Sequence, residues 1–180
     1  MRDQITALLG QIKTKDEVTF KHSLRVADLM SRFGAYLGKS EKEVEELRLA
    51  GLVHDCGKIS IPDEVLNKPA KLTNEEFQIM RNHTVYSADL LKSVDSEVIK
   101  NVAIGHHLSF NGNGYPDAAK AGKDIPEECR IACVCDVFEA LTAKRQYKEA
   151  MTASEAFKEM DKMPNFDPDL YESFKQMMNQ

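Results

Sequence analysis

Residues 52–58 read LVHDCGK, so two metal-competent side chains, His54 and Asp55, follow directly on an apolar run. An imidazole supplies a nitrogen ligand, and a carboxylate supplies oxygens that can bridge two ions. The pair also fits a plainer interpretation, a helix that ends with a capping aspartate and a surface histidine. The other histidines of the chain decide between these interpretations.

The composition indicates one acidic globular domain. The chain has 180 residues with 42% apolar content, enough for a single domain over residues 1–180 with a sizeable core. Its formal net charge of −5 provides no overall basic field for DNA or RNA. No apolar run approaches the ~20 residues that span a bilayer, and no signal-peptide core follows Met1. We therefore expect a cytoplasmic protein with reduced cysteines and with neither a membrane nor a nucleic-acid polymer as partner.

Helical periodicity runs through almost the whole chain, and no stretch alternates with the period of a strand. Three capping boxes, in which Ser or Thr precedes Glu by three residues, mark helix starts at residues 40, 73 and 152. The sequence therefore predicts an all-α fold. We expect helices at about residues 3–13, 16–37, 40–55, 73–94, 96–107 and 126–143, and two more that start at 152 and 167.

Several of these helices carry polar residues on faces that should be buried. Val18 and His22 recur with the apolar stripe of residues 16–37, and His83 falls in the middle of the 73–94 helix. The 126–143 helix is apolar around much of its circumference, so Asp136 within it needs a partner. Three cysteines of this helix lack the spacing of a zinc site, and we expect buried thiols: Cys129, Cys133 and Cys135.

One long irregular stretch runs from about residue 108 to 125. Within it, residues 111–116 read NGNGYP, where glycine and proline favour turns and disfavour a helix. This stretch directly follows the histidine doublet His106-His107. We therefore expect a loop beside the histidines.

All five histidines lie on or at the ends of predicted helices, together with two acids that should point inward. A single histidine on an apolar stripe is usually a satisfied core residue, but each such group buried alone would cost a few kcal/mol. A pair of metal ions removes that cost, and imidazole with carboxylate suits iron, manganese or zinc. The residues are His22, His54, His83, His106 and His107, with Asp55 and Asp136.

In order and spacing, these residues resemble the motif of the HD-GYP family, a branch of the HD metal-dependent phosphohydrolases. The resemblance covers about residues 15–175, after an N-terminal helix at 1–14. It implies a helical bundle of the HD type with two or three metal ions, usually iron or manganese, and cleavage of cyclic di-GMP to pGpG or GMP. It is carried by His22, the HDCGK segment of residues 54–58, His83, His106-His107, Gly114-Tyr115-Pro116 and Asp136.

The resemblance also implies a set of metal ligands in which Asp55 bridges two ions. Members with a third metal carry Glu four residues before the first histidine, where this chain has Val18, so we expect two ions. Zinc and nickel also accept such ligands. One ion would be held by His22, His54, Asp55 and Asp136, and the other by Asp55, His83, His106 and His107.

Further residues resemble the family's catalytic and substrate contacts. Lys58, Arg145 and Lys148 correspond to its basic phosphate contacts, although ordinary surface charge is the plainer interpretation. Tyr115 of the loop joins them as a substrate-binding residue. His54, Asp55 and Lys58 would be catalytic: activated water would attack the phosphodiester, and the cations would neutralise the developing charge.

The chain departs from the family pattern beside the ligands. Leu108 stands where the family has Glu after the histidine doublet, and Asn111 stands where it has Asp. Two other functions therefore stay open. The first is a catalytically weak cyclic-dinucleotide receptor that acts on a protein partner through the Gly112–Pro116 loop. The second is a phosphohydrolase of another nucleotide, such as a mixed cyclic dinucleotide or a nucleoside monophosphate.

Overall fold

The computed structural model describes residues 1–117, 119–144 and 150–180, which contain helices and loops and no strand. This confirms the all-α prediction. Two short 3-10 segments, Cys56–Ser60 and Gly122–Asp124, lie among the helices. The α-helices are α1 (Arg2–Lys15), α2 (Glu17–Tyr36), α3 (Glu41–Val53), α4 (Asp63–Leu66), α5 (Asn74–Arg81), α6 (His83–Leu90), α7 (Glu97–Gly105), α8 (Glu127–Thr142), α9 (Ala153–Met160) and α10 (Pro168–Met178).

The three predicted capping boxes are confirmed. At the start of α3, the Ser40 hydroxyl accepts from the backbone N–H of Glu43, and the Glu43 carboxylate accepts from the backbone N–H of Ser40. The same reciprocal pairs open α5 and α9. Such a cap contributes about 0.5–2 kcal/mol of stability and fixes where each helix begins. Gly38, with a φ of 74°, ends α2 in the left-handed conformation that favours glycine.

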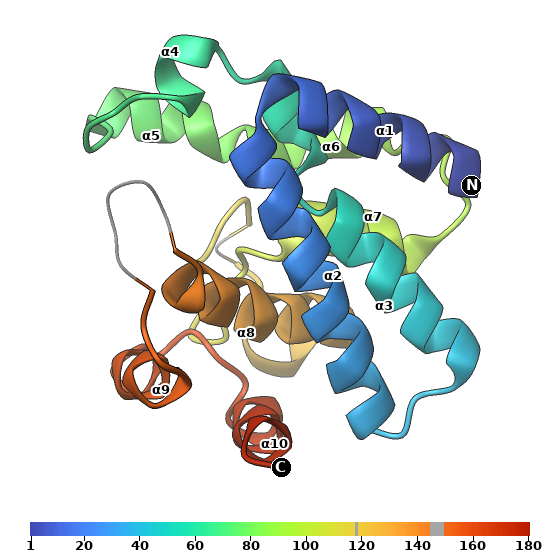
Figure 1. The fold of residues 1–180 in the computed structure, drawn as a ribbon, viewed down its shortest axis with the longest axis vertical. Coiled ribbons are helices and arrows are strands. Elements are labelled where there is room, and N and C mark those ends of the chain that lie inside the picture. Colours follow the sequence, from blue (N-terminus) through green and yellow to red (C-terminus); the bar gives the residue numbers. More distant parts are fainter. Residues whose placement is uncertain (118, 145–149) are drawn as a thin grey trace.

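Helix α2 runs through the centre of the molecule, with α1 across its start and α8 behind it (Figure 1). It packs closely on α3 at Gly51, where an added Cβ would lie 2.6 Å from the Cα of Ala27. Only a residue without a side chain allows this approach. The close packing brings the last turn of α3, and the segment that follows it, up to α2.

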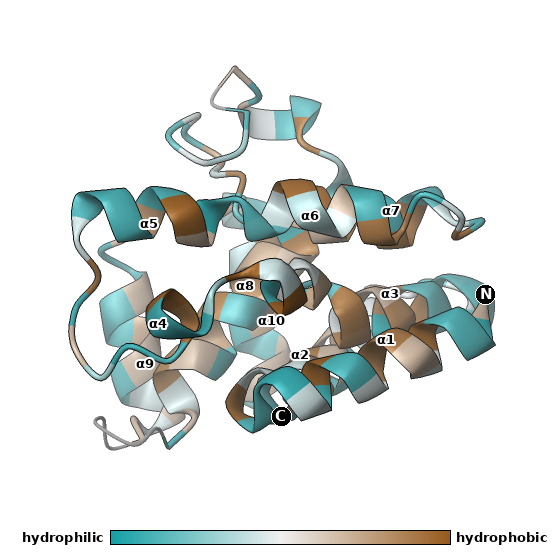
Figure 2. Cartoon of the chain, turned by 90° about the horizontal axis from the view of Figure 1, so that it is seen from above, coloured by the Kyte–Doolittle hydropathy of each residue, from teal (hydrophilic) through white to brown (hydrophobic). Residues whose placement is uncertain are grey.

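The main hydrophobic core lies between α1, α2, α3, α7, α8 and α10. Phe174 of α10 is fully buried and meets two aromatic rings edge-on, those of Phe33 (5.1 Å) and Phe138 (5.2 Å). Helix α1 buries Ile5, Leu8 and Ile12 on one face, and both hydrophobic and hydrophilic residues alternate along it (Figure 2). Within the described ranges, none of the helices has the length and apolarity needed to cross a bilayer.

Two local predictions were wrong. The expected helix over 73–94 is divided: α5 ends at Arg81 and α6 begins at His83, so His83 does not lie in mid-helix. The backbone N–H of Asn82 donates to the Ile79 carbonyl at 3.1 Å, and the Met80 carbonyl lies 2.7 Å from Nδ1 of His83, so the regular hydrogen-bond pattern is interrupted. Val18, expected on the inward stripe of its helix, is 61% exposed, because it lies in the first turn of α2 beside an open hollow.

Candidate metal centre

The structure brings together all seven predicted ligands, although they come from five separate parts of the chain. They lie in the first half of α2, directly after α3, at the start of α6, directly after α7 and in the second half of α8; Figure 1 shows these elements. Their nitrogen and oxygen atoms form two groups, each within 4.8 Å. The first group is His22, His54 and Asp136, and the second is Asp55, His83, His106 and His107.

The first group is compact. Nε2 of His22 lies 3.2 Å from Nε2 of His54 and 3.0 Å from Oδ1 of Asp136. Oδ2 of Asp55 approaches the same nitrogens, at 3.3 Å from His54 and 3.7 Å from His22. Asp55 thus contacts the first group through one of its carboxylate oxygens.

The second group surrounds the other oxygen of Asp55. Oδ1 lies 3.4 Å from Nε2 of His83 and 3.7 Å from Nε2 of His106. The two Nε2 atoms are themselves 3.4 Å apart. Asp55 therefore directs one oxygen toward each group, as a residue that bridges two ions would have to do.

Backbone carbonyls fix the orientation of three of these histidines. Each ring approaches a carbonyl with its Nδ1, and because a carbonyl only accepts, Nδ1 must donate. The neutral ring then turns the lone pair of Nε2 into the centre. The pairs are His54 with Gly51 (2.8 Å), His83 with Met80 (2.7 Å) and His106 with Val102 (2.9 Å).

The carboxylate of Glu139 orients His22, the histidine of the first group that no carbonyl holds. Sequence reasoning missed Glu139. Glu139 accepts from Nδ1 of His22 and also from Nε of Arg25, and it is only 2% exposed. It lies three residues after Asp136 in the mostly apolar α8. The argument that a buried acid needs a partner applied to Glu139 as well as to Asp136, and that was the available signal.

Burial and neighbouring charges act in opposite directions on the histidines. Burial lowers the pKa of His22, but hydrogen bonds to Asp136 and Glu139 outweigh burial and raise this pKa to about 9. Burial lowers the pKa of His83 to about 4 and that of His107 well below its usual 6.5. His83 and His107 are therefore neutral imidazoles at neutral pH, the form that binds metal ions.

The two acids of the centre are ionised. Burial tends to raise the pKa of Asp55, but the charge of Lys58, together with interactions with His106 and His54, outweighs burial and holds this pKa well below its usual value. The pKa of Asp136 is also low, because its hydrogen bond to His22 outweighs its burial. Both carboxylates can therefore serve as anionic ligands.

The residues of the centre fit divalent cations. Oδ1 of Asp55 is buried and has no hydrogen-bond partner within the described ranges. The Nε2 lone pairs of His83 and His106 face each other at 3.4 Å, an arrangement that a cation between them would stabilise. Imidazole and carboxylate ligands without thiolates suit iron, manganese or zinc, and the four cysteines are free and buried.

The two residues that end the HDCGK segment, Gly57 and Lys58, each have a structural role beside His54 and Asp55. A Cβ on Gly57 would lie 1.8 Å from the carbonyl oxygen of His83. The backbone N–H of Gly57 donates to Oγ of Ser87 at 2.9 Å. Glycine therefore allows this segment to pack on α6. The ammonium of Lys58 lies 2.6 Å from Oδ2 of Asp55, where it compensates the buried charge.

The loop at 111–116 packs on the second group. The ring of Tyr115 stacks on that of His107 with 4.6 Å between the centroids. The backbone N–H of Tyr115 donates to the backbone carbonyl of His107 at 3.1 Å. A Cβ on Gly114 would lie 2.3 Å from the backbone nitrogen of Ser109, so the loop needs glycine there. The amide oxygen of Asn111 accepts from Oγ of Ser109 at 2.6 Å and so helps to shape the loop.

A hollow of about 240 Å³ opens onto the centre. Among the predicted substrate contacts, Lys58 lines the hollow, and Tyr115 contacts the predicted ligand His107. Arg145 and Lys148 lie outside the described residues. The lining residues are Val18, Thr19, His22, Asp55, Lys58, His107, Asp136 and Ala140.

Comparison with known proteins identifies the family. The HD domain family profile matches residues 9–170, nearly the whole chain. Together with the helical fold and the His54-Asp55 centre, this match shows that the chain belongs to the HD domain family. The family predicted from the HDCGK segment and its companion histidines is thereby confirmed.

Curated relatives carry names that concern cyclic dinucleotides. Cyclic di-GMP phosphodiesterase PA4108 of Pseudomonas aeruginosa is 38% identical over 169 residues, covering 92% of this chain and 41% of the relative. The 3'3'-cGAMP-specific phosphodiesterase 2 of Vibrio cholerae is 35% identical over 176 residues, covering 95% of this chain and 34% of the relative. The chain thus spans less than half the length of these relatives.

A solved structure has the same fold. The HD domain of the phosphodiesterase PgpH of L. monocytogenes, in complex with cyclic-di-AMP, aligns with a TM-score of 0.69 at 19% identity. The alignment covers 95% of this chain and 94% of that one. At this identity the match supports the fold alone.

Proposed function

We propose that this chain is the hydrolytic domain of a dinuclear metal phosphodiesterase that cleaves cyclic di-GMP to pGpG or GMP. The observation that carries the proposal is the position of Asp55, whose two oxygens face two separate groups of ligands. The names of the curated relatives support a cyclic dinucleotide as the substrate class.

The ligand groups define how two ions would be held. His22, His54, Asp136 and one oxygen of Asp55 would hold the first, and the second group, with the other oxygen of Asp55, would hold the second. Val18, a residue that cannot ligate, lines the hollow next to the first group, which supports two ions per chain. Imidazole and carboxylate ligands favour iron or manganese, and also accept zinc or nickel.

The chain's own residues have distinct tasks in this proposal. Divalent ions, when bound, supply Lewis-acid charge that activates water and neutralises a phosphoryl group. His54 and Asp55 would supply ligand atoms to these ions. The ammonium of Lys58, at the wall of the hollow, offers a charge-assisted contact to a substrate phosphate. Tyr115 supports His107 through the stacking of the two rings. Phosphate binding by Arg145 and Lys148 stays a prediction.

A mixed cyclic dinucleotide is the second candidate substrate, because a relative at 35% identity is named as specific for 3'3'-cGAMP. The departures from the family pattern leave the ligand set intact. Leu108 is buried in a small apolar cluster with Ile125 and Cys129, and Asn111 bonds within the loop. Receptor action on a protein partner through Gly112–Pro116 and a cytoplasmic location remain predictions.

Metal analysis combined with a turnover assay tests the proposal. The protein is stripped with a chelator, reloaded with Mn²⁺ or Fe²⁺, and incubated separately with cyclic di-GMP and 3'3'-cGAMP. We expect about two ions per chain, release of pGpG or GMP, and loss of turnover in an Asp136→Ala variant. Tight binding of cyclic di-GMP without products would favour the receptor function, and faster cleavage of 3'3'-cGAMP would favour the mixed substrate.

A further inference from the structure

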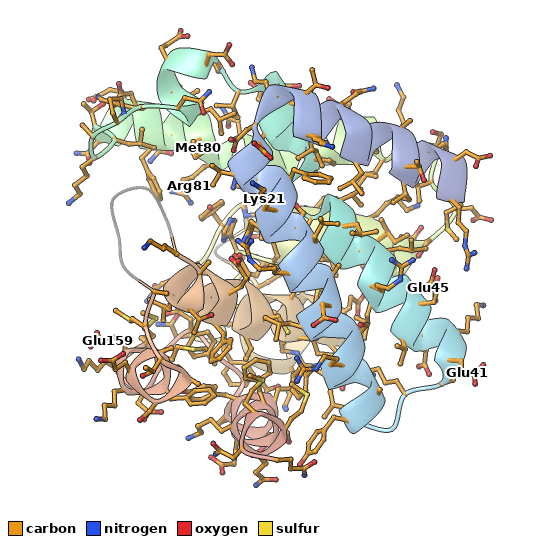
Figure 3. The ribbon with its side chains drawn as sticks, in the orientation of Figure 1. Lys21, Glu41, Glu45, Met80, Arg81 and Glu159 are labelled. Carbon is orange, nitrogen blue, oxygen red and sulfur yellow. The ribbon has the colours of Figure 1, made fainter. Side chains whose placement is uncertain are left out.

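Arg81 places a guanidinium beside the centre. It is the last residue of α5, and its Cζ lies 4.4 Å from the centroid of the Tyr115 ring. Tyr115 in turn stacks on His107, a member of the second ligand group. In Figure 3, Arg81 lies on the side of α5 that faces α8. The guanidinium is thus one aromatic ring away from a predicted ligand.

The charge of Arg81 is not neutralised by an acid within the described ranges. Among these residues, the Arg81 side chain contacts the Tyr115 ring, and no carboxylate pairs with it. By contrast, the ammonium of Lys58 is held 2.6 Å from Oδ2 of Asp55. Arg81 is half-buried, so its N–H groups remain available to a ligand that approaches the centre.

The contact with Tyr115 determines which ligand Arg81 can bind. The guanidinium carbon lies over the Tyr115 ring, and the N–H donors of a guanidinium can match two oxygens of a phosphate. A cyclic dinucleotide has two phosphodiesters. When one occupies the ligand centre, the other lies elsewhere on the protein and still carries its charge.

We propose that Arg81 binds the phosphodiester of the cyclic dinucleotide that is not being cleaved, and that Tyr115 holds the guanidinium for this purpose. The proposal rests on the proposed function and deepens it. Such a contact would let the site distinguish a ring with two phosphates from an ordinary single phosphodiester. Tyr115, with His107 and Arg81 both against its ring, is then a platform for Arg81.

A pair of substrates separates this role from a general effect on the centre. Arg81→Ala and Arg81→Lys are compared with wild type on cyclic di-GMP and on bis(p-nitrophenyl) phosphate, which has one phosphodiester. We expect Arg81→Ala to raise KM for cyclic di-GMP about 10- to 100-fold at unchanged kcat, the loss of one charge-assisted contact. Arg81→Lys should fall between, and bis(p-nitrophenyl) phosphate should be cleaved at the wild-type rate.

Arg32→Ala is the matched control, because Arg32 is an exposed arginine of α2 that lies 3.6 Å from Asp28. It should change neither KM, and metal content should be equal in all variants. An unchanged KM for cyclic di-GMP in Arg81→Ala, or an equal loss on both substrates, would overturn the proposal for Arg81 alone. A wild type that cleaved only bis(p-nitrophenyl) phosphate would refute the proposed function, and the proposal would fall with it.

Discussion

Replacing Glu139 by Gln tests how much the acid behind His22 contributes to the centre. The Glu139 carboxylate accepts from two donors, Nδ1 of His22 and Nε of Arg25. Glutamine keeps the size of the side chain but offers one accepting oxygen and an NH2 group that can only donate. Whichever way the amide turns, one of the two donors meets another donor.

The structure indicates which donor loses its partner. The Arg25 side chain is 49% exposed and can turn to water, whereas that of His22 is 8% exposed and cannot. The amide oxygen should therefore face His22, and the loss should be at the low end of the 1.5–3 kcal/mol for a hydrogen bond to a charged group. We expect the free energy of unfolding of the metal-free protein to fall by about 1.5 kcal/mol. Metal affinity should fall about tenfold, because a neutral acceptor makes the imidazole less basic.

Two measurements check these values: denaturant unfolding of the stripped protein and a Mn²⁺ titration against a competing chelator. Glu127→Gln is the matched control, since Glu127 lies in the same helix, is about half exposed and pairs with Lys39. Such a surface pair contributes about 0–1 kcal/mol, and metal affinity should not change. Wild-type stability and Mn²⁺ affinity in Glu139→Gln would refute the assignment of Glu139 as the residue that orients His22.

Three further changes probe the bridging residue, the packing and the charges. Asp55→Ala should abolish turnover and lower Tm while helical circular dichroism is retained, because bound ions add their binding free energy to stability; retained turnover would exclude the dinuclear site. Gly57→Ala should destabilise the protein by about 3 kcal/mol in denaturant unfolding, since its Cβ would lie 1.8 Å from the His83 carbonyl. In the metal-free protein, stability should decrease as pH rises from 6.5 to about 9, where the folded state binds the proton of His22 more tightly than the unfolded state does. It should also decrease as pH falls from 6.5 to about 4, because only the unfolded state readily protonates His83; His22→Gln and His83→Gln should each flatten one limb of the Tm profile.

The local parts of the fold could be predicted because they depend on a few adjacent residues. A capping box needs Ser or Thr and a Glu three residues on, and all three boxes formed. The division between α5 and α6 could not be predicted in this way. It involves the ring of His83 bonding to the Met80 carbonyl, an orientation that the ligand centre favours and helix propensity does not describe.

The candidate ligands could be predicted from the sequence, but the residues that contact those ligands from outside the centre could not. The order and spacing of the histidines and acids resemble a known motif, and the structure brings these residues together. Glu139 was missed because only Asp136 was recognised as a buried acid in the mostly apolar helix α8. The contact between Arg81 and Tyr115 joins residues 34 positions apart, and only the packing of the loop against α5 brings them together.

The charges around the centre explain how so many polar groups can be buried before any ion binds. Each acid has a positive partner on another residue: Asp55 pairs with Lys58, Glu139 with Arg25, and Asp136 with the proton that His22 holds at elevated pKa. Removing one partner of a buried pair costs several kcal/mol, but an intact set of pairs is close to neutral in stability. The helix caps and the aromatic core around Phe174 involve none of these groups. Ions that bind this centre would therefore meet a fold that its core and caps already stabilise, and their charge would be available for the proposed chemistry instead of being required for folding.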